Sequence, residues 1–177
     1  DDAVNFGAIG SVIGHELTHG FDDQGRKFDP RGNMADWWTE EDGREFEKRA
    51  TCIADQYAQY TVAGGVALDG RLTLGENTAD NGGVRMALRA YLKSLQGKER
   101  KVVDGFTPEQ RFFVGYGVSR CENTTVEYSR MLVDTDPHSP GKYRLIGAVS
   151  NMPEFWQAFN CVPGDAMMRG EKACRIW

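Results

Sequence analysis

The stretch Val12-Ile13-Gly14-His15-Glu16-Leu17-Thr18-His19-Gly20-Phe21-Asp22-Asp23 holds two histidines four residues apart, with a glutamate directly after the first. Residues i and i+4 lie on the same face of an α-helix, so His15 and His19 can bind one metal ion together. Glu16 can then lie beside the ion without binding it, where a zinc hydrolase needs its general base. A chance match on an amphipathic helix is the alternative. The spacing predicts a helix that binds one zinc ion.

The glycines of this segment indicate how the helix packs. We expect a helix over residues 5–19, followed by a loop over residues 21–38, where turn residues gather. Gly7, Gly10 and Gly14 recur at helical spacing. Because glycine weakens a helix, three of them predict close packing against another backbone.

A catalytic zinc ion needs a third protein ligand and one open position for water. His138 is the only other histidine, which favours a carboxylate, and Glu76 in the segment 75–83 is the candidate. We expect this segment to be helical, so that Asp80 follows Glu76 by one turn. Asp80 could accept the free ring N–H of a zinc-bound histidine, a contact that such ligands usually need. An acidic helix start without a metal is the alternative for both carboxylates.

Hydrolysis of a peptide bond also needs donors for the oxyanion that forms. His138 and Arg144 lie in the segment 134–144, which contains two prolines and a glycine and is expected to be a rigid loop. Both side chains could supply such donors. A capped loop histidine and an arginine in a surface salt bridge are the alternatives, and spacing alone favours these alternatives.

Further helices are predicted from capping residues and apolar periodicity. Thr39 with the acidic residues after it predicts a helix start, and an apolar stripe at helical spacing follows. Thr107 and Gln110 predict a capping box around a proline, and a last helix is expected to start near Pro153. Residues 66–68 are either a short strand or one arm of a turn. The predicted fold is mainly α with little strand.

The composition limits the classes of function. Hydrophobic residues make up 40% of the 177 residues, which suits one soluble domain with a core. The net charge of −5 and the lack of a basic patch argue against nucleic acid as a partner. No apolar run is long enough for a membrane span. The metal helix begins almost at once, without a signal-peptide pattern, so we expect the C-terminal piece of a longer protein.

The four cysteines are Cys52, Cys121, Cys161 and Cys174. None lies in a Cys-x-x-Cys pair, so a second, thiolate zinc site is not expected. Their even number and wide spacing suit disulfides in an oxidising compartment. Buried free thiols are the alternative.

Four motifs, in this order, resemble those of the neprilysin-like zinc metallopeptidases of family M13. They are the metal-helix segment 5–23, the segment 75–83, the segment 136–144, and the terminal Cys174-Arg175-Ile176-Trp177. The resemblance covers essentially the whole chain, which would be the C-terminal catalytic domain of a longer ectodomain. It implies a gluzincin with a mainly helical, thermolysin-like core that cuts short peptides on the amino side of hydrophobic residues. It also implies an extracytoplasmic protein, either secreted or membrane-anchored.

The resemblance implies one role for each candidate residue: zinc ligation by His15, His19 and Glu76, base catalysis by Glu16, orientation of a ligand histidine by Asp80, oxyanion stabilisation by His138, and binding of the substrate backbone by Arg144. Family members are several times longer than this chain. Ahead of the metal helix they carry an edge strand that binds the peptide and a helical domain that roofs the cavity. The expected partners are therefore peptide substrates and the missing N-terminal part.

The resemblance also bears on the cysteines and on substrate selectivity. It implies a disulfide between Cys52 and Cys174. Cys121 and Cys161 would pair with cysteines of the missing part, and in the isolated chain they would be unpaired or would pair with each other. The positions that help to line the family's primed-side pocket are occupied here by Ser11, Val12, Ser119 and Arg120. Because Arg120 replaces an apolar residue, we expect tolerance for polar or acidic side chains there.

The function expected from these observations is that of a zinc-dependent endopeptidase. One alternative is a non-catalytic zinc-binding fragment, since the substrate strand and the roof are missing. A second is an aminopeptidase with the same metal motif, but no second glutamate-rich motif near the metal helix offers an anchor for a free amine. A third is a structural interaction module, whose function would survive removal of zinc.

Overall fold

The computed structural model describes residues 1–177, and it is a helical protein without a β-sheet. Its only strand-like pairings are isolated antiparallel bridges within turns: Phe28 with Met34, Thr61 with Ala67, and Val103 with Phe106. The prediction of a mainly α fold is confirmed, and residues 66–68 form one arm of a turn. No helix combines the length and the apolar character that crossing a lipid bilayer requires.

The metal motif lies at the end of one continuous helical segment. This segment consists of α1 (Asp2–Asn5), a π-helical turn (Phe6–Gly10) and α2 (Ser11–His19). Asp1 caps its start by accepting a hydrogen bond from the backbone N–H of Val4, so the segment begins before residue 5, where the sequence predicted its start.

Two of the remaining helices begin at the predicted capping residues. Thr39 caps α3 (Glu40–Tyr57), and Thr107 caps α5 (Pro108–Ser119), each through a reciprocal capping box. Between them lies α4 (Leu74–Ser94), the longest helix of the chain. The other elements are α6 (Val126–Thr135), α7 (Gly141–Val149), α8 (Pro153–Ala158) and two short 3₁₀ turns, Gly25–Lys27 and Gly170–Lys172.

The predicted loop over residues 134–144 is wrong at both of its ends. α6 continues to Thr135, and α7 already begins at Gly141, directly after Pro140. Proline is tolerated at the very start of a helix, where its missing N–H breaks no helical hydrogen bond. Only residues 136–140 are irregular, so His138 lies in the loop whereas Arg144 lies on α7.

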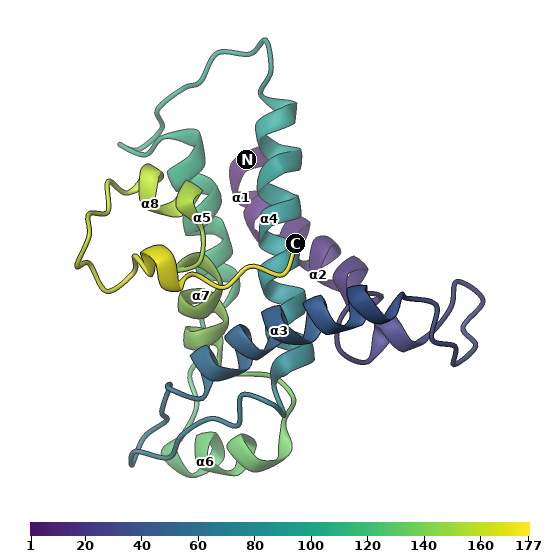
Figure 1. Cartoon of the computed structure of the whole chain (residues 1–177). Coiled ribbons are helices and arrows are strands. Elements are labelled where there is room, and N and C mark those ends of the chain that lie inside the picture. Colours follow the sequence, from purple (N-terminus) through teal and green to yellow (C-terminus); the bar gives the residue numbers. More distant parts are fainter.

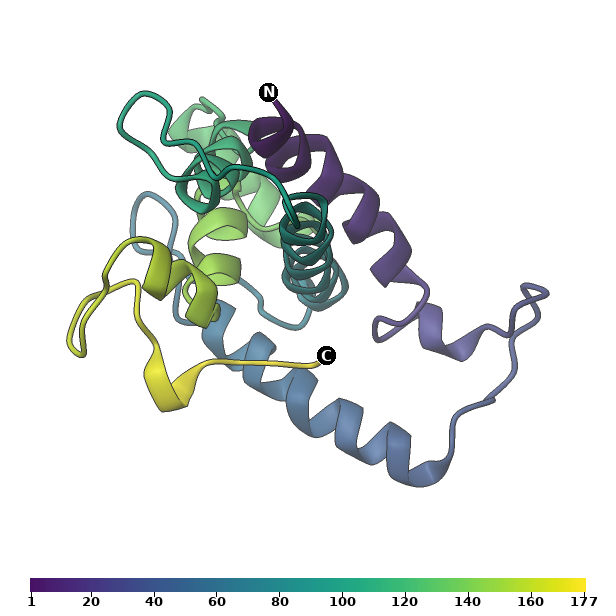
Figure 2. The ribbon, with the colours of Figure 1, turned by 90° about the horizontal axis from the view of Figure 1, so that it is seen from above.

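α4 occupies the centre of the molecule. It packs against α2, α3, α5 and α7, and Figure 2 views it nearly end-on with these helices around it. In Figure 1 it runs upright through the middle of the molecule, with α3 crossing near its lower end and α6 below it. Leu88 of α4 is buried with Phe112 and Tyr116 of α5 in the larger of two apolar clusters. The segments α2 and α4, which carry the candidate ligands, therefore belong to one packed unit.

Glycines set the distance between α2 and α4. A Cβ atom built on Gly14 would lie 2.7 Å from the carbonyl oxygen of Gly83 and 2.9 Å from its Cα. A Cβ atom built on Gly7 would likewise collide with the backbone of α5, whereas one built on Gly10 would have its nearest neighbour at 3.6 Å. The predicted close backbone packing is confirmed for two of the three glycines.

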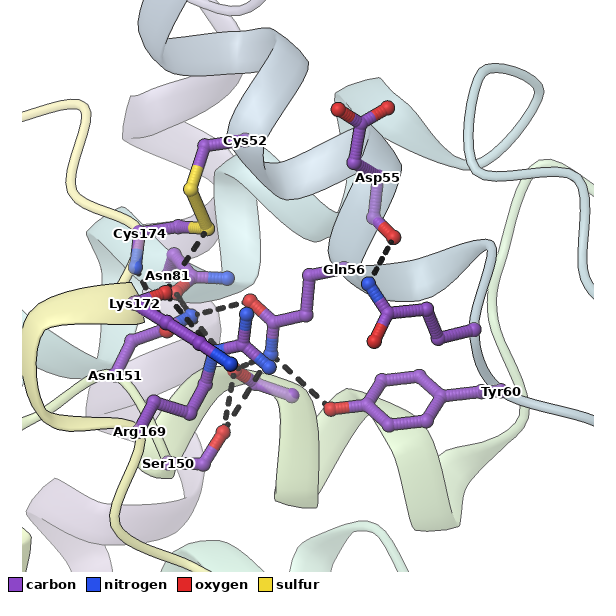
Figure 3. Close-up of a disulfide and its surroundings, with 12 residues drawn as sticks. Cys52, Asp55, Gln56, Tyr60, Asn81, Ser150, Asn151, Arg169, Lys172 and Cys174 are labelled. Carbon is purple, nitrogen blue, oxygen red and sulfur yellow. Dashed lines mark hydrogen bonds between the residues drawn. A yellow bond between two sulfur atoms is a disulfide. The ribbon is translucent and has the colours of Figure 1, made fainter.

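The C-terminal segment is fixed to α3. Cys52 and Cys174 form a disulfide with Cα atoms 5.6 Å apart, and Figure 3 shows the buried amides beside it. Asn151 accepts from the backbone N–H of Cys174 and donates to Gln56 of α3. This pairing agrees with the one that the resemblance implied. Cys121 and Cys161 are free, so they do not pair with each other.

Candidate metal centre

Three potential ligands from two helices converge at one point. His15 and His19 lie on α2 and Glu76 lies in the first turn of α4, and their ligand atoms are all within 4.8 Å of one another. The two Nε2 atoms are 3.0 Å apart, and Nε2 of His15 is 3.1 Å from Oε2 of Glu76. The structure thus brings together the three residues that the sequence analysis selected.

Each histidine of this cluster is held from behind by a carboxylate. Nδ1 of His15 lies 2.9 Å from Oδ1 of the buried Asp80, and Nδ1 of His19 lies 2.7 Å from Oδ2 of Asp22. When Nδ1 donates its proton to a carboxylate, the lone pair of Nε2 is left free to point at a metal ion. The arrangement therefore keeps a proton on Nδ1 of each ring and leaves Nε2 as the nitrogen that faces the centre of the cluster.

The sequence analysis assigned no role to Asp22 or to Asp136. Asp22 follows His19 by three residues, and its other oxygen accepts from the backbone N–H groups of Gln24 and Gly25. Asp136 precedes His138 by two residues and binds both its backbone N–H and its Nδ1, each at 2.8 Å. An acidic residue two or three positions from a candidate histidine was the signal that could have revealed both.

Burial and neighbouring charges shift the pKa values of His15 and Glu76 in opposite directions. Burial alone would lower the pKa of His15, yet the carboxylates of Asp80 and Glu76 raise it to about 9. Burial would raise the pKa of Glu76, but His15 and the neighbouring His138 and His19 hold that pKa below its usual range. Without a metal ion, His15 is therefore protonated at neutral pH, and a cation that binds here displaces that proton.

A zinc ion fits these residues by their chemistry. Two neutral imidazoles and one carboxylate, with a position left for water, form a common ligand set of catalytic zinc. Oε2 of Glu76 is buried and has no hydrogen-bond partner by geometry, although two ring nitrogens lie near it. Such an oxygen is more stable when it binds a cation than when it is left unpaired.

The other candidate residues surround the cluster on several elements. Glu16 lies on α2 beside His15 with an exposed side chain, and it does not belong to the converging set. Nε2 of His138 lies 3.2 Å from Oε2 of Glu76. Arg144 approaches the same oxygen at 3.6 Å while it holds both oxygens of Asp80. His138 and Arg144 therefore do belong to one site, although the loop predicted for them is shorter.

The four predicted pocket positions differ in exposure. Ser11 is buried, with its backbone close to Gly83 of α4, whereas Val12 is half-buried. Ser119 is exposed at the end of α5. Arg120 turns inward and binds Oδ1 of Asp80 at 2.8 Å. The pocket role of these positions stays a prediction.

Comparisons with known proteins identify what the chain resembles as a whole. Residues 1–176 match the model of peptidase family M13. The chain is 45% identical to mouse membrane metallo-endopeptidase-like 1 over 180 residues and 45% identical to neprilysin-1 of Caenorhabditis elegans over 181 residues. These alignments cover 99% of this chain but only 23% and 24% of those proteins, so the chain spans about a quarter of their length.

A solved structure agrees with these relatives. The zinc metalloprotease Zmp1 of Mycobacterium tuberculosis, crystallised with an inhibitor, superposes with a TM-score of 0.94 at 42% sequence identity. The superposition covers 100% of this chain and 28% of that protein. The helical arrangement described above is therefore that of a segment found within a longer metalloprotease.

Proposed function

The chain belongs to peptidase family M13, and on that premise we propose that it is the catalytic part of a zinc-dependent endopeptidase. The observation that supports this most strongly is the convergence of His15, His19 and Glu76 within 4.8 Å, since this ligand set suits catalytic zinc. The proposed ligands hold one zinc ion, and Asp80 and Asp22 orient the two histidines.

In the proposed mechanism, zinc supplies Lewis acidity, which lowers the pKa of water and polarises a carbonyl group. Glu16 accepts one proton from the attacking water as the bond between its oxygen and the carbonyl carbon forms. Glu16 then gives that proton to the amine nitrogen as the carbon–nitrogen bond breaks. Asp136 holds a proton on Nδ1 of His138, so His138 acts as an imidazolium and donates its second proton-bearing nitrogen, Nε2, to the developing oxyanion.

The substrates we propose are short peptides whose backbone binds beside the metal. The side chain of Arg144 is 15% exposed although it is paired with Asp80. Its guanidinium can therefore donate a hydrogen bond to a backbone carbonyl of the substrate near the scissile bond. We also propose that Ser11, Val12 and Ser119 border the primed-side pocket and set its preference.

We propose that the partner of this chain is the remainder of the same peptidase. Ile9, Ile13 and Leu17 form a stripe at i, i+4 spacing on the metal helix, and their exposed fractions are 58%, 58% and 62%. An apolar face of this kind is normally buried against other residues. The remainder of the peptidase would cover it and would pair with the free Cys121 and Cys161, in an extracytoplasmic, oxidising compartment.

The first experiment loads the chain with zinc and measures cleavage of a blocked, internally quenched peptide library. The control is Glu16→Gln, which keeps the shape of the side chain but removes the base. We expect the variant to keep its zinc and to lose at least ~10²-fold in rate. Equal cleavage by the wild type and by this variant would contradict the proposal.

Other outcomes point to the other candidate functions. Cleavage that requires a free amino terminus would identify an aminopeptidase, because an endopeptidase also cuts blocked peptides. Bound zinc without cleavage would identify a binding fragment that needs the remainder of the peptidase to hold a substrate. A function that survives removal of zinc would identify an interaction module.

A further inference from the structure

We propose that Arg120 is a positioning residue that fixes the zinc ligand His15 through Asp80. The inference rests on the proposed function insofar as it takes His15 to bind zinc. It differs from a pocket role for Arg120, because it assigns the guanidinium to the interior of the protein and not to the substrate.

The contacts of Asp80 carry this inference. The side chain of Asp80 has no solvent exposure, and its Oδ1 receives His15 Nδ1 at 2.9 Å and an Arg120 terminal nitrogen at 2.8 Å. The same oxygen also receives an Arg144 nitrogen at 2.9 Å. Hydrogen bonds to a charged group orient both partners more strongly than neutral ones do. The position of the His15 ring is therefore coupled to Arg120 through one shared atom.

Arg120 is itself held where this contact requires it. It directly follows the last turn of α5, and its guanidinium carbon lies 5.3 Å from the ring centroid of the fully buried Tyr116. Its side chain is only 12% exposed, and its Nε is buried without a hydrogen-bond partner. A charge that is buried and already paired in this way is poorly placed to select substrate side chains.

The proposed mechanism explains why two arginines, and not one, bind Asp80. Arg144 holds Oδ2 through Nε at 2.7 Å and Oδ1 through a terminal nitrogen, and it is also the residue proposed to bind the substrate backbone. When a terminal nitrogen of Arg144 turns to a substrate carbonyl, Arg120 still holds Oδ1. Arg120 thus keeps His15 oriented while Arg144 binds the peptide backbone.

The test is the zinc dissociation constant of the whole chain, measured by competition with a chelator of known affinity. Arg120→Met keeps an unbranched apolar stem but removes the guanidinium and its charge, and we expect it to weaken zinc binding about 10-fold, at the low end for residues that support a ligand. Arg120→Lys keeps the charge but offers a single donor group, and we expect an intermediate loss. Thermal unfolding of each variant reports whether it is folded.

A matched control separates positioning from general stability. Arg85 lies on α4 with Asp80, is 14% exposed and donates to the carbonyl of Asn151, but it does not contact Asp80. We expect Arg85→Met to lower Tm without a change in zinc affinity. If Arg120→Met does not fold, Arg120→Lys gives the same readout.

Unchanged zinc affinity in a folded Arg120 variant would overturn the proposal. A change confined to the ratio of cleavage of peptides with Asp and with Phe after the scissile bond would overturn it too, in favour of a substrate contact. Because zinc titration needs no substrate, failure of the wild type to cleave peptides would contradict the proposed function while leaving this test intact.

Discussion

At the residue scale, the proposed ligation of zinc by His19 depends on which of its ring nitrogens carries the proton. Oδ2 of Asp22 lies 2.7 Å from Nδ1 of His19, so the proton is held on that nitrogen and Nε2 keeps its lone pair. Asp22→Asn keeps the volume and can still accept from the backbone N–H groups of Gln24 and Gly25 through its oxygen. Its amide NH₂ then faces Nδ1 and favours the tautomer in which Nε2 is protonated.

We expect Asp22→Asn to weaken zinc binding by ~10–100-fold, the usual range for loss of a carboxylate behind a ligand histidine. Equilibrium competition with a chelator measures this change. The adjacent Asp23→Asn is the matched control, because Asp23 contacts Gln24 and no ligand histidine. Equal losses in the two variants would show that removal of charge, and not the tautomer, is responsible.

Sequence reasoning selects candidate ligands more readily than the residues that would orient them. His15 and His19 are separated by one helical turn, so the local spacing alone places them together. Glu76 was selected among 26 acidic residues because Asp80 follows it by one helical turn and because the segment 75–83 resembles a family motif, since its distance from α2 depends on tertiary packing. Asp22 lies beyond the end of α2, where the direction of a side chain depends on turn geometry that spacing does not encode.

At the scale of elements, the distance between α2 and α4 decides whether the proposed ligands meet. A methyl group on Gly14 would lie 2.7 Å from the carbonyl oxygen of Gly83, which is backbone and cannot move aside alone. Gly14→Ala therefore forces the two helices apart. We expect it to cost about 1–3 kcal/mol of unfolding free energy, and to weaken zinc binding as well because His15 and Glu76 separate.

The control for this prediction is Gly10→Ala on the same helical segment. Its nearest neighbours lie at 3.6 Å, an ordinary contact distance, and alanine favours the helix by up to about 1 kcal/mol. Denaturant unfolding and zinc titration should separate the two variants. A zinc affinity that is unchanged in Gly14→Ala would mean that the cluster adapts to a wider separation of the helices.

The helices themselves were predictable to the extent that their ends carry local signals. Thr39 and Thr107 lie where helices begin, because a hydroxyl in this position satisfies a backbone N–H within its own turn. The segment 134–144 was misread because its prolines indicate a loop, yet Pro140 directly precedes α7. Whether a proline ends a loop or begins a helix depends on what packs after it, and that is tertiary information.

At the scale of the whole molecule, the proposed zinc ligands and the disulfide lie on different helices. The ligands belong to α2 and α4, whereas Cys52 on α3 holds the C-terminal segment, in which Cys174 and Ile176 are buried. The pairing itself could be expected only from the family resemblance, since four cysteines allow three pairings. The separation of the two regions predicts that stability and metal affinity respond differently to loss of the bond.

The double variant Cys52→Ser, Cys174→Ser tests this separation. The bond links residues 122 positions apart, so its loss restores much conformational freedom to the unfolded chain and should cost about 2–5 kcal/mol. For a chain of this size that lowers Tm by roughly 5–15 °C. At 25 °C we expect the folded variant to bind zinc with an affinity within about threefold of the wild type, because no ligand or orienting carboxylate touches the bond.

The control is Cys121→Ser, which removes an exposed free thiol and should change neither Tm nor zinc affinity. If zinc affinity instead falls together with Tm, α3 and the C-terminal segment also hold α4 in the position that brings Glu76 to the histidines.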